Sequence, residues 1–554
     1  MNLNKIKTIL PFAALLLSMG LSSCTNDLNV TPIDPRKNTT VDAQRLFNKC
    51  YAEFVLEGDG PGDKELDFPD AGLSVLYRLV WNANDLTTDE ALCGWNDNGI
   101  AEFVSGNFTP NNQSLYAMYW RLCFGVSICN QYLKECSDYD ATMTAEVHFL
   151  RDLYYYFMLD NFGNPSYAEE ISSENPQQIS SAELFQKIVE DLEANMGQML
   201  SPSVRKNGQQ NYGRADQSAA WMLLARLYLN AEKYTGTAQW AKARDYAAKV
   251  INESGRSIWM GDNTTTHRSA NGAYSAYQML FMADNDLTGA YNESIFAFVQ
   301  DGASTAGWGG SLFLLAASWD GNMAAVYPQK SDQAWGGNRT RKDLIEKFIS
   351  LSDFDALPNW KAETIIAGAG DDRALLFGDN AKGDGGVKDR KYTNDKLAEF
   401  TEGIATIKYT SQRSDNGSTS DSRFTDNDIM LMRLAEAYLI YAEAEARADG
   451  STTTKATGTG YINQLHERAN CSSKNKGAYT LDEILDERAR ELYFEGVRRT
   501  DLIRYGYFGG STSYTWQWKG GIQSGGQLEA YKNIYPIPST ELGANPNLKQ
   551  NPGY

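Results

Sequence analysis

The sequence predicts a mainly α-helical protein, in which a tetratricopeptide-like helical scaffold carries an irregular, loop-rich lobe with short strands. Several segments place apolar residues at helical spacing. Two of them contain a pair of helices within about 34 residues, which is the length of a tetratricopeptide unit. Residues 257–425 differ, because Gly, Asn, Asp and Ser are dense there, Trp and Tyr are interspersed, and no period persists. Loops held on a rigid scaffold are a common place for binding surfaces.

The N-terminal residues 1–23 have the pattern of an export signal. Lys5 and Lys7 precede an apolar stretch, 9–21, that is too short to span a bilayer, and Ser22 and Ser23 precede Cys24. This arrangement resembles the bacterial lipoprotein box, in which the cysteine is acylated and becomes the new N-terminus. The alternative is an ordinary secretory signal in which Cys24 is incidental. Residues 24–40 are polar and proline-containing, so we expect a tether with little structure of its own.

Helical segments then follow in order along the chain. Residues 146–162 carry one apolar face, and Gly163-Asn164-Pro165 ends that helix. Residues 218–252 carry two apolar stripes, one on each side of a break at 233–237, which predicts a pair of helices. Residues 430–469 predict a second pair of helices, with alanines where the two helices meet. Residues 481–505 predict one long amphipathic helix. Its charged residues fall at i,i+4 spacing (Asp486 with Arg490, Glu495 with Arg499), which favours a structural helix over a catalytic one.

The composition excludes several classes of function. With 51 Lys and Arg against 70 Asp and Glu, the net charge of −19 argues against nucleic acid as a partner and favours a neutral ligand. The motifs HExxH, GxSxG, GxxxxGK[ST] and GxGxxG are all absent. The six cysteines other than Cys24 form no CxxC, so we expect isolated buried thiols rather than a zinc site or a disulfide framework.

Motifs in a fixed order along almost the whole mature chain resemble the SusD/RagB family of outer-membrane lipoproteins. In chain order the motifs are Cys24-Thr-Asn-Asp-Leu-Asn-Val-Thr-Pro-Ile-Asp-Pro35, Phe149-Leu-Arg-Asp-Leu-Tyr-Tyr-Tyr156, Gly213-Arg-Ala-Asp216, Leu224-Ala-Arg-Leu-Tyr-Leu-Asn-Ala231, Phe281-Met-Ala-Asp-Asn-Asp286, Gly370-Asp-Asp-Arg-Ala-Leu-Leu376, Arg433-Leu-Ala-Glu-Ala-Tyr-Leu439, Trp516-Gln-Trp-Lys-Gly-Gly521 and Tyr535-Pro-Ile-Pro538. The resemblance implies a lipid-anchored, surface-exposed protein that is not an enzyme. Such a protein captures oligosaccharides for a SusC-like TonB-dependent transporter, with its helical layer toward the transporter and its glycan site on the lobe.

The resemblance also implies the residues of a glycan site. A sugar offers C–H faces to aromatic rings and hydroxyls to carboxylates, amides and guanidinium groups. The positions that match contacts to malto-oligosaccharide, an α-glucan derived from starch, in starch-binding members are Asp70, Arg78, Trp95, Asn98, Trp308 and Trp335. One departure is Cys93, which stands where the family has a further tryptophan, so we expect a shorter or differently shaped aromatic platform.

Each of these residues also has a structural interpretation. Tryptophans in helical stripes, such as Trp120, Trp221 and Trp240, are expected in the core, whereas those of the predicted site lie in Gly-, Asn- and Asp-rich loops. Asp70 and Arg78 could form a plain surface ion pair, and Asn98 could be a turn residue.

A second implied site is a structural calcium ion at Asp286, Asp426 and Asp428. Carboxylate oxygens are the ligands that calcium prefers, although solvated turn residues would have the same sequence. Three alternatives to α-glucan capture remain at this point: another neutral glycan, a glycoside hydrolase with two carboxylates, and a tetratricopeptide adaptor that binds only protein.

Overall fold

The computed structural model describes residues 41–57, 66, 68, 70–261, 268–269, 272–327, 329–379, 388–448 and 450–554. The predicted export signal, Cys24 and the 24–40 tether lie outside these residues. Helical residues far outnumber strand residues in the described chain, and every described strand is short. The prediction of a mainly α-helical protein is therefore confirmed.

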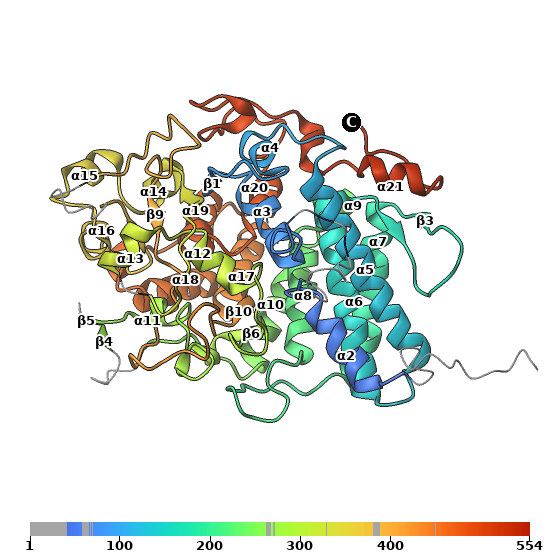
Figure 1. Ribbon diagram of the computed structural model, residues 1–554. Coiled ribbons are helices and arrows are strands. Elements are labelled where there is room, and N and C mark those ends of the chain that lie inside the picture. The colour runs from blue at the N-terminus through green and yellow to red at the C-terminus, as the bar shows by residue number, and fades with distance from the viewer. Residues whose placement is uncertain are drawn as a thin grey trace, which may run out of the picture.

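Helices fill the first half of the described chain, and the longest of them pack side by side on the right of Figure 1. They are α2 (Ala43–Ala52), α3 (Leu76–Asp85), α4 (Ile100–Ser105), α5 (Gln113–Glu135), α6 (Ala141–Phe162), α7 (Ser181–Asn195), α8 (Gln217–Leu229), α9 (Ala231–Thr235) and α10 (Trp240–Glu253). Helix α6 is capped by Asp140, whose side chain accepts the N–H of Met143, so it begins at Ala141, before the predicted start at residue 146. It ends at Gly163 with φ 68°, as the sequence predicts. Helices α5 and α6 approach closely at Gly125, where a Cβ would lie 2.3 Å from the Tyr154 ring.

The two predicted helix pairs join into one layer. Helix α8 packs on α10, and α17 (Leu434–Ala448) packs on both α10 and α18 (Ala456–Arg468). Fully buried alanines allow these close contacts, since their small side chains let the backbones approach: Ala220, Ala243, Ala247, Ala435, Ala442 and Ala446. Trp221 lies in this core, whereas Trp120 and Trp240 are half-buried and pack against its edge.

The long helix expected at 481–505 is broken. It forms α19 (Leu481–Leu492) and α20 (Arg498–Arg504), because the chain turns between them with positive φ at Phe494 (62°) and Gly496 (76°). Tertiary contacts hold the turn: the Trp81 indole N–H donates to the Phe494 carbonyl at 2.9 Å.

Neither expected i,i+4 pair is formed, although Asp486 and Arg490 both lie in α19. Asp486 pairs with Lys347, and Glu495 pairs with Arg433 and Lys408. The charged residues of this segment are structural, as predicted, but through contacts to other elements.

The lobe on the left of Figure 1 is built from short elements. Its helices are α11 (Ala276–Met279), α12 (Ser311–Ala316), α13 (Gly321–Val326), α14 (Lys342–Phe348), α15 (Leu351–Ala356) and α16 (Ala362–Ala369). Its strands are β4 (Arg268–Ser269), β5 (Gly272–Ala273), β6 (Ser294–Phe298), β7 (Asn338–Thr340), β8 (Leu376–Phe377) and β9 (Ala405–Thr406). The remaining elements are β1 (Ala91–Cys93), β2 (Ser166–Tyr167), β3 (Gln177–Gln178), β10 (Ile429–Arg433), α21 (Ser539–Ala544) and short 3₁₀ turns at Met196–Gln198, Gly289–Asn292, Ser472–Lys474, Lys519–Gly521 and Ala530–Asn533.

The described strands form two-stranded antiparallel sheets, in the pairs β1–β7, β6–β10, β2–β3, β4–β5 and β8–β9. The β1–β7 pair joins the N-terminal part to the lobe, with Ala91 opposite Thr340 and Cys93 opposite Asn338. The six described cysteines are free thiols. In the part of the chain that the structure describes, no helix combines the length and apolar character needed to cross a membrane.

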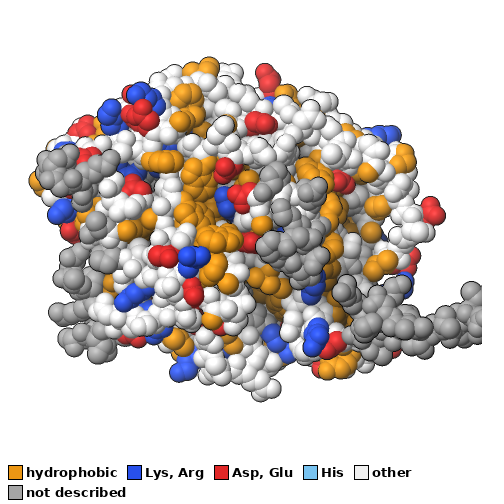
Figure 2. All heavy atoms as spheres, viewed as in Figure 1, with side chains coloured by type: hydrophobic (Ala, Val, Ile, Leu, Met, Phe, Trp, Pro, Cys, Tyr) orange, Lys and Arg blue, Asp and Glu red, His pale blue; other side chains and the backbone are white. Residues whose placement is uncertain are grey.

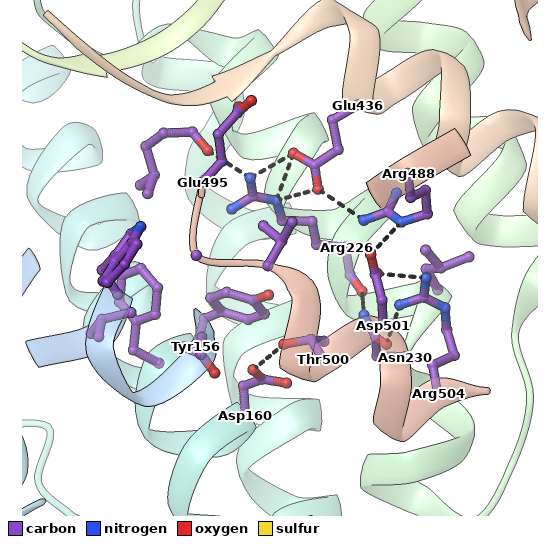
Figure 3. A pocket seen from close by; sticks show the side chains of 18 of the residues that line it. Tyr156, Asp160, Arg226, Asn230, Glu436, Arg488, Glu495, Thr500, Asp501 and Arg504 are labelled. Carbon is purple, nitrogen blue, oxygen red and sulfur yellow. Dashed lines mark hydrogen bonds and ion pairs between the residues drawn. The ribbon is translucent and has the colours of Figure 1, made fainter. Parts of the chain in front are cut away.

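A network of buried charges ties the helical layer together around a small internal cavity (Figure 3). The Glu436 carboxylate of α17 accepts hydrogen bonds from Arg226 of α8 and lies 3.9 Å from Arg488 of α19. Asp501 of α20 accepts from both Arg488 and Arg504 at 2.7 and 2.8 Å. Because all of these side chains are buried, each charge depends on its partners for compensation.

Candidate binding site

Three loops carry the tryptophans of the predicted site to one place. Trp95 follows β1, Trp335 precedes β7, and Trp308 precedes α12. The β1–β7 pairing extends past the strands, since the Gly94 N–H donates to the Gly337 carbonyl at 3.1 Å, and this sets Trp95 beside Trp335. The Trp335 N–H donates to the Ala316 carbonyl at 2.7 Å, which fixes its loop to the end of α12. Residues more than 200 positions apart in the chain thus meet on one surface.

The three indoles form a curved row, here called the tryptophan arc (Trp95, Trp335 and Trp308). Ring centroids are 6.3 Å apart for Trp95 and Trp335 and 6.0 Å apart for Trp308 and Trp335. The ring planes tilt by 51° and 36° from one ring to the next. Each indole is half-buried against the core, so each leaves part of its surface open. Figure 2 shows hydrophobic side chains gathered in a band over the region where β1 and α12 lie in Figure 1.

Two glycines make room for the arc. A Cβ on Gly337 would lie 2.1 Å from the Trp95 ring, and a Cβ on Gly72 would lie 2.6 Å from the Trp308 Cβ. Real Cβ contacts are not this short, so the indoles occupy space that only glycine leaves free. The positions of the rings therefore depend on the backbone beneath them.

Arg78 supplies the polar floor of the site. It lies on α3 and is 4% exposed, with its guanidinium 5.5 Å from the Trp95 ring centroid and 4.7 Å from that of Phe313. Within the described residues it donates no hydrogen bond, and its Nε is buried without a partner. Burial lowers the pKa of Arg78, and the nearby carboxylates Asp70 and Asp97 oppose that effect. A buried guanidinium with unused donors can donate hydrogen bonds to the hydroxyl oxygens of a ligand.

Carboxylates surround this guanidinium. Asp70 accepts the N–H of Leu73 at 2.9 Å and so caps the turn that leads into α3. Burial raises the pKa of Asp97, and the charge of Arg78 acts against that increase. Burial also raises the pKa of Glu57, whose carboxylate accepts the backbone N–H of Trp308 and so supports one end of the arc.

These side chains line one open cavity of about 600 Å³. Its lining comprises Asp70, Ala71, Gly72, Arg78, Trp95, Asp97, Trp308 and Trp335. Five of the six residues predicted for the glycan site are among them. The volume of the cavity suits a small ligand, since ligand cavities span roughly 300–1,000 Å³. The side chains in its lining suit a ligand with both apolar faces and hydroxyl groups.

Asn98 is the predicted residue that the structure does not bring to the cavity. It is exposed, and its carbonyl accepts a hydrogen bond from the Ser114 hydroxyl at 2.6 Å. Asp97, which the sequence reasoning missed, lines the cavity instead. The only available signal was its place in the polar turn Gly94-Trp-Asn-Asp-Asn-Gly99. Cys93, the departure from the family pattern, is 3% exposed in β1 and lies beneath the site, where burial raises its pKa to about 12.

The three aspartates predicted for calcium lie near one another. Burial and the charges of Asp286 and Asp426 raise the pKa of Asp428 to about 7. Most of their oxygens accept protein hydrogen bonds: Asp428 from the Gln300 N–H and the Tyr212 hydroxyl, and Asp426 from the N–H groups of Gly302 and Ser420. One oxygen of Asp286, Oδ1, is buried without a partner.

The fit of these residues to calcium is thus partial. Across the described ranges, no three acidic, histidine or cysteine side chains converge in the manner of a metal site. The unpartnered oxygen of Asp286 is the feature that a cation would satisfy.

Comparison with known proteins gives the family. A model of the SusD family matches residues 325–554. The chain is 36% identical to the starch-binding protein SusD of Bacteroides thetaiotaomicron, over 97% of each chain. A SusD superfamily protein from Parabacteroides distasonis superposes with a TM-score of 0.66 at 18% identity, covering 92% of this chain and 98% of that one. Surface glycan-binding protein A from Bacteroides thetaiotaomicron, in complex with laminarihexaose, superposes with a TM-score of 0.63 at 21% identity, covering 92% and 98%.

The two solved structures share the fold of this chain, while the curated relative shares both sequence and length. At this identity over almost the whole of both chains, the protein belongs to the SusD family.

Proposed function

We propose that this protein captures an α-glucan, starch-derived malto-oligosaccharide, on the tryptophan arc and delivers it to a SusC-like TonB-dependent outer-membrane transporter. The observation that carries the proposal is that three indoles share one cavity with the buried guanidinium of Arg78, whose Nε has no hydrogen-bond partner among the described residues. Proteins of the SusD family bind glycans and do not cleave them, so the chain is not an enzyme. The relative named for starch binding supports starch as the source of the ligand.

The shape of the arc favours a curved chain. Aromatic rings that stack on a flat, ribbon-like glucan would lie nearly in one plane, whereas these rings tilt by 51° and 36° in succession. A helical α-1,4-glucan presents sugar faces that turn in the same way. A β-1,3-glucan also curves, and a relative of the same fold is in complex with laminarihexaose. A β-1,3-glucan is therefore the second candidate among neutral glycans.

Affinity electrophoresis against amylopectin, laminarin, a mixed-linkage β-glucan and inulin tests the proposal. We expect retardation in amylopectin and none in inulin, with a measured affinity for maltoheptaose by titration calorimetry. Retardation in laminarin alone would transfer the proposal to β-1,3-glucans. Absence of retardation by every polysaccharide would overturn it and favour the adaptor that binds only protein. Release of reducing ends from amylopectin would contradict the non-catalytic role.

We also propose that acyl chains on Cys24 hold the protein on the cell surface. Each buried methylene contributes roughly 0.8 kcal/mol, so two or more chains give lasting attachment. Cys24→Ala should therefore give a folded protein that leaves the membrane fraction in cells that lack the transporter. Full retention in such cells would contradict the anchor.

A structural calcium ion near Asp286, Asp426 and Asp428 remains part of the proposal. A cation bound only by the native state stabilises it by mass action, so EDTA should lower the melting temperature and leave glycan affinity unchanged. Asp286→Asn should remove the response to calcium, because it replaces the unpartnered carboxylate oxygen. Equal melting temperatures in EDTA and in excess calcium would eliminate the metal site.

A further inference from the structure

A second cavity lies in the lobe and shares no lining residue with the site of the tryptophan arc. Its volume is about 640 Å³, similar to that of the first cavity. Helix α11, helix α16 and the segment 407–416 surround it, and the loop that later carries Trp335 passes along it at Tyr327, Gln329 and Lys330. The proposed glycan capture on the tryptophan arc does not involve this cavity.

Amides in its wall are oriented by the protein and, within the described residues, keep free hydrogen-bonding groups. The Gln329 Oε1 accepts from the Ser411 N–H at 2.7 Å, the Ser411 hydroxyl at 2.8 Å and the Thr410 hydroxyl at 3.2 Å. The Ser411 hydroxyl itself accepts the N–H groups of Lys330 and Ser331, so its own proton is available to Gln329. This arrangement fixes which end of the Gln329 amide faces the serine and leaves the Nε2 donors free.

Two further amides follow the same pattern. The Gln278 Oε1 accepts the Ser275 N–H at 3.0 Å, which leaves Nε2 free. The Asn470 Nδ2 donates to Asp372 at 2.6 Å, which leaves Oδ1 free. The cavity thus offers amide donors and an acceptor from three different elements, and hydroxyl groups can use both kinds.

The rest of the wall is apolar or charge-balanced. Met282, Ile366, Ile407 and the ring of Tyr327 provide surface that suits C–H groups. Each charged group of the wall already has a protein partner. Glu363 accepts the Tyr327 hydroxyl at 2.7 Å, and Asp372 accepts from the Asn470 amide. The Lys330 ammonium donates to the Asn416 carbonyl at 3.4 Å, and the Lys408 ammonium is paired with Glu495. A wall whose charges are already partnered favours a neutral ligand.

We propose that this cavity is a second saccharide site, which takes one or two hexose units of a neutral sugar. A cavity of this size falls within the range for small ligands, roughly 300–1,000 Å³, and it is less open than the cavity of the tryptophan arc, which suits a short sugar rather than a long chain. The site is independent of the tryptophan arc, so it stands or falls separately from the proposed capture of a polysaccharide.

The test uses the full chain carrying Trp95→Ala and Trp335→Ala, which removes binding at the arc. Titration calorimetry and saturation-transfer NMR with glucose, maltose and laminaribiose should still detect binding in this background. Ala367→Trp, placed on the exposed side of α16 where it lines the cavity, should block it. Thr364→Trp on the same helix does not line the cavity and is the matched control. Gln329→Ala should weaken the binding by about tenfold, since it removes a fixed donor.

Binding that survives in the arc-deleted chain, is lost with Ala367→Trp and is kept with Thr364→Trp would support the second site. If none of the three sugars binds the arc-deleted chain, or if Ala367→Trp leaves the binding unchanged, the inference is overturned. Should Gln329→Ala fail to fold, Ala367→Trp still decides the result. Retardation of the unmodified protein by polysaccharide gels reports on the arc alone and separates the two proposals.

Discussion

Arg78 combines burial with unused hydrogen-bonding capacity. A guanidinium carries five N–H donors, and within the described residues none of them has an acceptor. The faces of Trp95 and Phe313 stabilise the charge in part through cation–π contacts. Sugar hydroxyls that enter the cavity would complete its hydrogen bonds, which makes this residue important to binding rather than to stability.

Arg78→Met should separate the two effects. Loss of hydrogen bonds to a charged donor should weaken maltoheptaose binding by about 1.5–3 kcal/mol, or roughly 10–100-fold, whereas removal of a buried unpaired Nε should leave the melting temperature equal or higher. Calorimetric titration and scanning calorimetry measure the two quantities. Arg341→Met is the control, because Arg341 donates to the buried carbonyls of Leu86, Ala91 and Val104. It should destabilise the fold instead, and an unchanged affinity in Arg78→Met would contradict the role of Arg78.

The rings of the arc should behave in the same way. Trp95→Ala, Trp308→Ala and Trp335→Ala should each weaken glycan binding by about 2 kcal/mol or more, with small changes in melting temperature. Trp221→Ala, in the buried seam of α8, should instead cost about 3–5 kcal/mol of stability and leave affinity intact. A large loss of stability in all three arc variants would mean that these rings serve mainly as core.

At the scale of single residues, the sequence predicted the turn that contributes to the site, but not which of its side chains faces the cavity. Asp97 faces the cavity and Asn98 does not, because the direction of each side chain depends on how the turn is held. Here Gly99 adopts φ 87°, and the Ser114 hydroxyl binds the Asn98 carbonyl. The contact from Glu57 to Trp308 joins residues 251 positions apart, and no local pattern could reveal it.

At the scale of elements, the β1–β7 pair positions the site. Its two strands are only three residues each, yet their pairing sets Gly337 directly under the Trp95 ring. The arc thus depends on a short sheet whose own side chains are buried.

Gly337→Ala should therefore disturb binding through Trp95. The added methyl would overlap the indole, and overpacking of this kind costs about 1–3 kcal/mol, here mainly as displacement of the ring and a loss of glycan affinity. Tryptophan fluorescence and titration with maltoheptaose measure the effect. Gly321→Ala is the control, because a Cβ at Gly321 meets nothing within 4 Å. Equal affinities in the two variants would show that Trp95 does not need its present position.

Periodicity predicted the helices of the scaffold well, because their apolar faces are long and regular. It failed at 481–505, where the apolar and charged pattern continues across the break between α19 and α20. Phe494 is not a residue that local preference would place at positive φ. The hydrogen bonds from Trp81 and Tyr409 to its carbonyl come from distant segments, so tertiary contacts override the local pattern.

Across the whole molecule, buried ion pairs hold the helical layer together. Composition does not reveal that so many arginines are internal, since the net charge of −19 reports only the surplus of acidic residues. Arg226, Arg488 and Arg504 join α8, α19 and α20 to each other through Glu436 and Asp501. These contacts join residues between positions 226 and 504 and could not be read from charge patterns along one helix.

Glu436→Gln should lower the free energy of unfolding by about 3–5 kcal/mol, because it leaves buried arginines without their counter-charge. Urea denaturation followed by circular dichroism measures this loss. Lys187→Gln is the control, since its partner Glu169 is exposed and such surface pairs contribute at most about 1 kcal/mol. A change in Glu436→Gln no larger than in the control would contradict the role of the network.

Trp95, Trp308 and Trp335 stand on loops that leave the scaffold at three separate points. A substitution in one loop can therefore replace its aromatic ring without altering the helices below, and the ligand preference can change while the architecture stays the same. Such modularity is consistent with two relatives: one that shares this fold at 21% identity is in complex with laminarihexaose, and one at 36% identity is named for starch binding. A new ligand preference would thus need substitutions at only a few loop positions, while the helical scaffold stays the same.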